Sequence, residues 1–190
     1  MRFAYYNRLS AREKATYRKS DAVSGIDLPD APALVPLVAE LEAALTTGKR
    51  LATAKAVNAL VLALCRQLHV PPVRVTVRLV RPEYQGGELH GLYTFAEAGS
   101  VPTIEVWMKT AAHKRVVRFR AFLRTLLHEV AHHLDVTLLG FTDSFHTQGF
   151  FRRESSLFSQ LVSTPPKKDA KTRSEPEQLG LFGGKQGVRT

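Results

Sequence analysis

The sequence predicts an α+β fold, in which the helices and a small sheet occupy different parts of the chain. Long segments with apolar residues at helical spacing come first, and three short strand candidates follow them. Two more helical segments complete the ordered body, which we expect at residues 1–162. Helices on both sides of a group of strands are typical of this class.

Three helices are expected in the first part of the chain, residues 1–70. Ser10 is the expected N-cap of the first helix, and Gly48 the expected end of the second. Pro71 and Pro72 would stop the third, because proline cannot continue a helix. The expected helices span residues 7–23, 31–48 and 50–70.

The middle of the chain predicts a small, mostly antiparallel sheet. From Val73 to Leu79 apolar and polar residues alternate, as in a strand with one buried face. The segment PTIEVWMK is the expected edge strand, to which an extended peptide would add as a further strand. The expected strands span residues 73–80, 88–95 and 102–109.

Two helices and a tail complete the chain. The first helix is expected from Lys114 to Leu139, ending at Gly140, and the second over residues 148–161. From residue 163 to 190 the chain is polar, charged and proline-bearing without apolar periodicity, which predicts disorder.

The composition indicates a basic protein of the cytoplasm. The 190 residues include 27 lysines and arginines against 17 acidic residues, a formal net charge of +10, which favours a nucleic-acid partner. The single cysteine, Cys65, excludes an internal disulfide and fits a reducing compartment. No signal peptide is expected, and no apolar run is long enough for a bilayer, so we expect no membrane partner.

The segment LHEVAHHLD, residues 127–135, carries three histidines and two carboxylates among apolar residues. His128 and His132 are one helical turn apart, so both imidazoles project from one face and can bind one tetrahedral zinc ion. Glu129 lies close enough to take a proton from a metal-bound water, the H-E-x-x-H arrangement. The alternative is two hydrogen-bonded core histidines with Glu129 at the surface, which we favour less because burying them together is costly.

A catalytic zinc site needs a third protein ligand and one open position. His146 is favoured, because imidazole is the commonest metal ligand and its segment can fold back over the motif helix. Glu154 is the alternative third ligand, although it could instead hydrogen-bond a ligand or be an ordinary surface charge.

The remaining histidines and Asp135 are not expected to bind the metal. His133 is turned by about 100° from its neighbour around the helix and is a poor ligand. Asp135 is expected to hold a histidine ring by a hydrogen bond, but a surface position fits it and His133 equally well. Structural roles are expected for His69, His90 and His113.

This set of residues predicts peptide-bond hydrolysis. Zinc lowers the pKa of its water and polarises the peptide carbonyl. Glu129 would accept the proton of that water and pass it to the leaving amine. We therefore expect a zinc endopeptidase with one Zn²⁺ ion.

Over residues 73–161 the chain resembles zincin metallopeptidases, and among them it is most similar to the SprT/Spartan type. The motif His128–His132 matches the first signature of that family, H-E-x-x-H. His146 and Phe150 match the spacing of the second, H-G-x-x-[FW], although Thr147 stands where the family usually has glycine. The resemblance implies a zincin-like fold and a protease of DNA repair that cleaves proteins crosslinked to DNA.

A short apolar peptide lies in the tail. Residues 178–182 read QLGLF, which resembles the bacterial sliding-clamp-binding peptide Q-L-x-L-F. Apolar side chains in a disordered tail gain from filling a groove on a partner, whereas the alternative is a patch that folds back on the body. The resemblance implies that the tail recruits the protein to replication sites, as in Spartan-type proteases, by binding the sliding clamp. The expected clamp-binding residues are Gln178, Leu179, Leu181 and Phe182.

A basic segment leads up to the H-E-x-x-H motif, since no acidic residue lies between Glu105 and Glu129. Arg120 and Arg124 continue the four-residue spacing of the two motif histidines, so a basic ridge would lead DNA phosphates toward the metal. The alternative is a solvated basic face that binds nothing. The expected DNA-binding residues are Lys114, Arg115, Arg118, Arg120 and Arg124.

Two other functions fit the same residues. A zincin dedicated to one regulatory protein, such as a repressor, would need neither DNA nor the clamp. A non-enzymatic adaptor would hold zinc in a closed four-ligand site and would bind DNA and the clamp. The favoured function is a zinc metallopeptidase of the bacterial cytoplasm that acts on DNA-associated or DNA-crosslinked protein.

Overall fold

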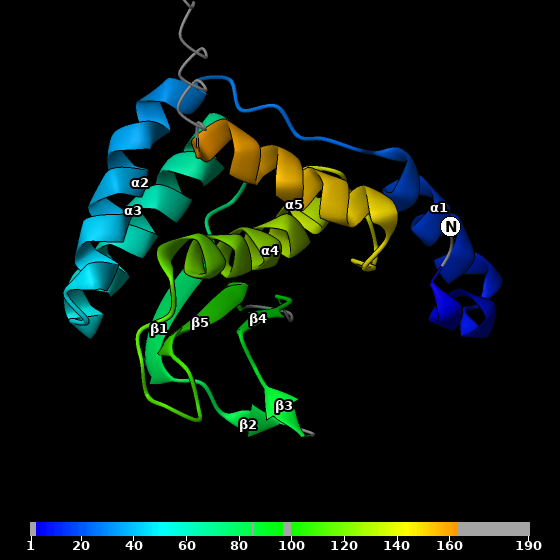
Figure 1. Ribbon diagram of the computed structural model, residues 1–190. Helices are drawn as coiled ribbons and strands as arrows, with labels where there is room; N and C mark the ends of the chain where they lie inside the picture. The colour runs from blue at the N-terminus through cyan, green and yellow to red at the C-terminus, as the bar shows by residue number, and fades with distance from the viewer. Residues whose placement is uncertain (1–2, 85, 97–99, 163–190) are drawn as a thin grey trace, which may run out of the picture.

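The computed structural model (Figure 1) describes residues 3–84, 86–96 and 100–162, and the predicted clamp peptide lies outside them. Helices precede and follow the strands, which confirms the α+β class. None of the described helices is long and apolar enough to cross a membrane. The helices are η1 (Ala4–Arg8), α1 (Ala11–Ala22), α2 (Ala31–Thr46), α3 (Arg50–Gln67), α4 (Phe119–Thr137) and α5 (Gln148–Leu161). The strands are β1 (Arg74–Val80), β2 (Glu83–Tyr84), β3 (Gly87–Glu88), β4 (Gly91–Thr94) and β5 (Thr103–Lys109).

The ends of the first three helices follow local sequence signals. Ser10 Oγ accepts a hydrogen bond from Glu13 N at 3.3 Å, and Glu13 Oε2 accepts one from Ser10 N at 2.7 Å, so α1 begins with a capping box. After α2, Gly48 has a φ of 68°, a conformation that glycine adopts without a steric penalty. The third helix ends at Gln67, ahead of Pro71 as predicted.

The three-stranded sheet is mixed, so the prediction of a mostly antiparallel sheet is wrong for it. The strand order is β1-β5-β4, with β5 parallel to β1 and antiparallel to β4. Because β5 inserts between two strands that run in opposite directions, it must be parallel to one of them. β5 is therefore the central strand, not the predicted edge strand, and β4 lies at the edge.

Helices cover one face of this sheet, and α4 lies between the sheet and α5 (Figure 1). α4 contacts β4, β5 and α5, whereas α3 contacts β1 and α2. Leu79, near the end of β1, was predicted on the buried face but is 45% exposed. The strand residues buried in the main core are Val75, Val77, Ile104, Val106 and Met108.

The motif helix begins five residues later than predicted, because the chain before it extends the sheet. Val117 N donates to Met108 O at 2.8 Å, and Val116 forms a bridge with Lys109. Lys114, the predicted first residue, has a φ of 51° and lies in the turn before this bridge. α4 therefore starts at Phe119 and carries the H-E-x-x-H motif in its second half.

Candidate metal centre

The structure brings together the three histidines predicted as metal ligands. His128 and His132 project from α4, and His146 precedes α5. His146 Nε2 lies 3.0 Å from His128 Nε2 and 3.1 Å from His132 Nε2. Two nitrogens bound to one zinc ion at a tetrahedral angle lie about 3.3 Å apart. The spacing therefore fits one small metal ion.

Phe150, which with His146 matches the spacing of the H-G-x-x-[FW] signature, packs against all three imidazoles. The distances between its ring centroid and theirs are between 4.6 and 5.1 Å. Thr147, which stands where the resembling family usually has glycine, is the N-cap of α5, and its hydroxyl accepts from Phe150 N at 2.9 Å. This cap fixes the start of α5 directly after His146.

Hydrogen bonds to the other ring nitrogens set which imidazole atoms carry protons. His128 Nδ1 lies 3.0 Å from Glu154 Oε2, and an ionised carboxylate only accepts, so Nδ1 donates. His132 Nδ1 lies 2.7 Å from Ser144 Oγ, whose own hydrogen goes to Asp135 Oδ2 at 2.8 Å. Ser144 therefore accepts from His132. Both Nε2 atoms then point lone pairs at the third imidazole, a donor set that suits a cation.

Burial lowers the pKa of His132 and of His146, which favours the neutral imidazole that binds metals. The pKa of His132 is lowered to about 3, first by burial and then by its neighbours His128 and His146. The pKa of His146 is also lowered, first by burial and then by His128.

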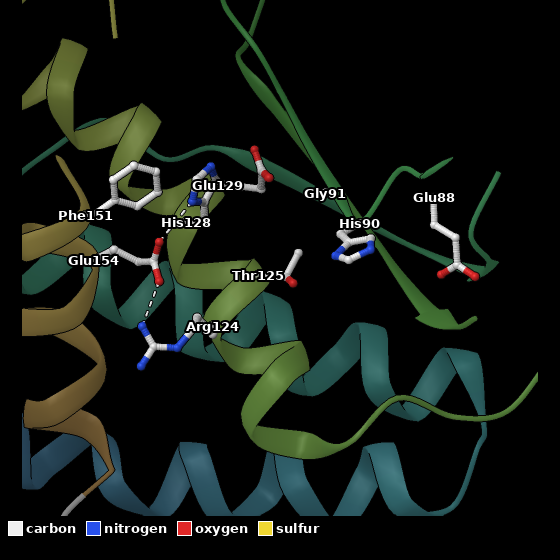
Figure 2. A pocket seen from close by; sticks show the side chains of 9 residues that line it. All are labelled: Glu88, His90, Gly91, Arg124, Thr125, His128, Glu129, Phe151 and Glu154. Atoms are coloured by element: carbon white, nitrogen blue, oxygen red, sulfur yellow. Dashed lines mark hydrogen bonds and ion pairs between the residues drawn. The ribbon is translucent and has the colours of Figure 1, made fainter. Parts of the chain in front are cut away.

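Glu154, the alternative third ligand, lies on the other side of the His128 ring from the Nε2 cluster. It accepts from His128 Nδ1 and, through Oε1, from Arg124 Nη1 at 2.9 Å (Figure 2). Although burial alone would raise its pKa, the hydrogen bonds from His128 and Arg124 lower it. Glu154 thus orients a ligand candidate and is not brought to the cluster.

Glu129 is buried beside the cluster, not at the surface. Its side chain is among the buried ones, with 6% of the residue exposed. The pKa of Glu129 is raised to about 7: burial raises it most, His128 and the Tyr93 N–H oppose the shift, and Glu154 adds a smaller increase. A carboxyl group with this pKa can both accept and release a proton near neutral pH.

Two neighbouring clefts meet at Glu129. One, of about 530 Å³, is lined by His128, Glu154 and His90, the last of which had been given only a structural role (Figure 2). The other, of about 250 Å³, is lined by the ligand candidates His132 and His146 and by Ser144, which holds the His132 ring. Glu129 lines both clefts.

Gly91 in β4 makes room for the Glu129 side chain. A Cβ atom at position 91 would meet Glu129 Oε1 and would lie 2.8 Å from Glu129 Cγ. The sequence offered a signal for this contact, because an isolated glycine in a strand often marks a close approach.

His133 and Asp135 are fully buried, so the alternative of surface positions is wrong for both. His133 Nε2 contacts Pro71 O at 2.8 Å, and its Nδ1 contacts the Tyr93 hydroxyl at 3.3 Å. This pattern keeps His133 away from the cluster, as predicted for a poor ligand. Asp135 does not contact the His132 ring directly. It accepts a hydrogen bond from Ser144, and Ser144 in turn contacts His132 Nδ1.

The sequence reasoning missed Arg153, which is 0% exposed and connects three helices. Its Nη2 donates to both oxygens of Asp135 at 2.8 and 3.1 Å, while Nη1 donates to Ser20 O and Val23 O, both at 2.6 Å. Arg153 thus satisfies carbonyls at the end of α1 and pairs the buried Asp135 carboxylate. The signal was present, because Arg153 falls on the apolar stripe of α5 at helical spacing from Phe150.

A second missed contact comes from the N-terminal segment. The Tyr5 hydroxyl donates to His146 O at 2.9 Å, and its ring lies 6.5 Å from that of Phe145. Nothing in the sequence pattern indicated that η1 would reach the third histidine.

The five basic residues predicted to bind DNA are all exposed, and two of them, Arg120 and Arg124, lie on α4 one turn apart. The guanidinium groups of Arg120 and Arg124 lie over the Phe158 ring, 5.0 and 4.4 Å from its centroid. Arg124 also pairs with Glu154. The other three lie before α4: Lys114, Arg115 and its N-cap Arg118.

Comparison of the chain with protein-family models, with curated proteins and with solved structures gives no match.

Proposed function

We propose that this protein is a zinc metalloendopeptidase that acts on DNA-associated or DNA-crosslinked proteins, in the manner of the SprT/Spartan zincins that it resembles. One observation carries the proposal: three imidazole Nε2 atoms converge beside a buried carboxylate whose pKa is raised to about 7. This combination is what metal-assisted hydrolysis needs at neutral pH.

In the proposed site His128, His132 and His146 hold the metal, and zinc would supply Lewis acidity for the peptide carbonyl and lower the pKa of a water molecule. Glu129 accepts a proton on its carboxylate and later delivers it to the leaving amine. Glu154 and Ser144 hold the His128 and His132 rings by their Nδ1 atoms, so the ligands need no rearrangement.

The substrate would bind along β4, which takes over the role first expected of β5. β4 lies at the edge of the sheet, and Gly91 places it against Glu129. Leu92 and Phe95 are 42% and 46% exposed, and both line the cleft that contains His132 and His146. An extended peptide that adds to this edge would bring a backbone carbonyl toward the histidine cluster.

Recruitment to DNA is proposed from charge and from the tail. The net charge of +10 favours a polyanion, and Arg118 at the start of α4 is exposed near the cleft. The QLGLF peptide at 178–182 is the proposed contact with a bacterial sliding clamp.

The position of Glu154 favours an enzyme over the adaptor with a closed zinc site. A closed site needs four protein ligands, whereas Glu154 is engaged by His128 Nδ1 and Arg124. Among the described residues the cluster offers three histidines, which leaves one tetrahedral position for water or substrate.

A cleavage assay tests this function. The zinc-loaded full chain is incubated with a basic DNA-binding protein, with and without single-stranded DNA. We expect cleavage that DNA stimulates, and Glu129→Gln should lower it by about 10²–10⁴-fold. No cleavage of this substrate under either condition, despite bound zinc, would favour the protease dedicated to one regulator. Equal cleavage by Glu129→Gln would refute the proposed role of Glu129.

A further inference from the structure

A third cavity, of about 490 Å³, lies at the N-terminal end of α4. Its lining includes Arg81, Thr110 and Arg118, together with His90 and Arg124. His90 and Arg124 also line the 530 Å³ cleft of Glu129, so the two cavities share a wall. The basic cavity is therefore adjacent to the proposed cleavage site.

The charge of this cavity is positive. Three arginines line it, and its lining contains no carboxylate. Two of these arginines are paired with carboxylates outside the lining: Arg81 Nη1 donates to Glu88 at 3.1 Å, and Arg124 Nη1 donates to Glu154 at 2.9 Å. Arg118 is exposed and makes no ion pair with any residue that the structure describes. An anion would find an uncompensated cation here.

Hydrogen-bonding capacity at the cavity is also unused. Arg81 is only 9% exposed, and its Nε atom has no hydrogen-bond partner among the described residues. Thr110 Oγ1 is a second buried atom without a partner in the described part of the chain. Buried polar groups are nearly always satisfied, so two orphans at one cavity point to a ligand or its hydration water.

The start of α4 adds a third contribution. Arg118 is its N-cap but forms no capping hydrogen bond with its side chain, and the first turn contains no acidic residue. The free N–H groups of such a turn favour an anion, as does the helix dipole. The turn before it is held in place, because Thr110 N donates to Arg115 O at 3.0 Å and Val117 N to Met108 O at 2.8 Å.

We propose that the cavity formed by Arg81, Thr110 and Arg118 binds a phosphate group of a nucleic-acid strand. The strand then crosses the start of α4, and a protein attached to it reaches the adjoining cleft of Glu129. The inference deepens the proposed function, because it names where nucleic acid lies beside the peptidase site. It replaces the ridge of five basic residues by one pocket, in which Arg120 has no part.

Binding is tested with the full chain and a fluorescent single-stranded oligothymidine of about 16 nucleotides, by anisotropy at several salt concentrations. Arg118→Ala should weaken binding by about fivefold or more and lower the salt slope by about one, whereas Arg118→Lys should recover part of the affinity. Arg81→Gln gives a second test inside the pocket. Arg12→Ala is the matched control, because Arg12 is also an exposed arginine, lies on α1 and does not line the cavity.

Equal affinities of wild type, Arg118→Ala and Arg81→Gln would overturn the proposal. A second arm adds inorganic phosphate at constant ionic strength and measures thermal stability. Stabilisation that depends on Arg118, without any change in oligonucleotide affinity, would show a free-phosphate site and overturn the assignment to a strand. Neither arm measures proteolysis, so a failure of the peptidase assay leaves this test unaffected.

Discussion

At the scale of single residues, Gly91 and Glu129 are packed too closely for a methyl group between them. A Cβ atom at position 91 would collide with the Glu129 carboxylate, the far end of a flexible side chain. The fold can therefore tolerate Gly91→Ala, but the carboxylate has to move away from its place beside the histidines.

We expect Gly91→Ala to keep its metal and lose activity. The catalytic rate should fall by about tenfold or more, part of the 10²–10⁴-fold that a general base contributes. Measuring kcat/KM and zinc content side by side checks this. Gly25→Ala is the control, because its Cβ would meet no atom closer than 3.4 Å. Full activity in Gly91→Ala would show that the position of Glu129 is not set by this contact.

At this scale the sequence pointed to the three histidines that lie together, and it offered Glu154 and Asp135 as residues that hold a ligand ring, but it gave no sign of Ser144. His128 and His132 follow from helix geometry alone, because local spacing decides which face they share. Ser144 and Asp135 depend on how the segment after α4 folds back, which no local pattern encodes. Asp135 also needs Arg153, whose contact with it depends on the packing of α5 against α4.

At the scale of elements, the N-terminal segment supports the third histidine. Tyr5 in η1 donates to the carbonyl of His146, and α1 contacts α5. Residues 1–70, to which the resemblance assigned nothing, therefore include part of the scaffold of the site.

Tyr5→Phe should weaken metal binding with little loss of stability. A single partly exposed hydrogen bond contributes about 0.5–1.5 kcal/mol, and its loss frees the segment that carries His146. Competition with a zinc chelator measures the affinity, which we expect to drop severalfold. Tyr6→Phe removes a hydroxyl that accepts from Arg18 in the same aromatic group, away from the metal. A drop of equal size in Tyr6→Phe would contradict a specific role for Tyr5.

Arg153→Met tests how the helices are joined. The variant leaves the buried Asp135 carboxylate without its cation, which should cost about 3–5 kcal/mol of unfolding free energy near pH 7. In the variant the pKa of Asp135 lies above its unfolded value, so folding binds a proton and stability recovers as the pH falls toward about 5. Denaturation with urea at both pH values measures this. Arg152→Met is the control, because Arg152 is exposed, and an equal loss there would contradict the account.

The sheet shows where prediction from sequence ends at this scale. The strand segments were found because alternation is local, but pairing is not. Parallel pairing of β1 with β5 joins residues that lie 29 positions apart, such as Arg74 and Thr103, and β4 decides it by occupying the other side of β5. The start of α4 was misplaced for the same reason, because Val116 pairs with the end of β5.

At the scale of the whole molecule, the proposed metal joins two parts of the chain. His128 and His132 belong to α4, whereas His146 belongs to the segment that leads into α5. A ligand that binds only the folded state stabilises it in proportion to the logarithm of its concentration over Kd.

Removal of zinc with a chelator should therefore lower the Tm of the full chain by about 5–15 °C, which is a loss of about 3–4 kcal/mol. Calorimetry of the loaded and chelated protein checks this. His146→Ala should show almost no difference between the two states, because one of the joined parts no longer binds. An equal shift in His146→Ala would place the stabilising metal elsewhere.

The central claim is that three imidazoles from α4 and the segment before α5 hold one zinc ion. The most direct test is the zinc-to-protein ratio of the purified full chain, measured by mass spectrometry of the metal for wild type, His146→Ala and Glu154→Gln. The account predicts about one zinc per chain in wild type and Glu154→Gln, and a large loss in His146→Ala. Retention of zinc in His146→Ala together with its loss in Glu154→Gln would contradict the account and make Glu154 the third ligand.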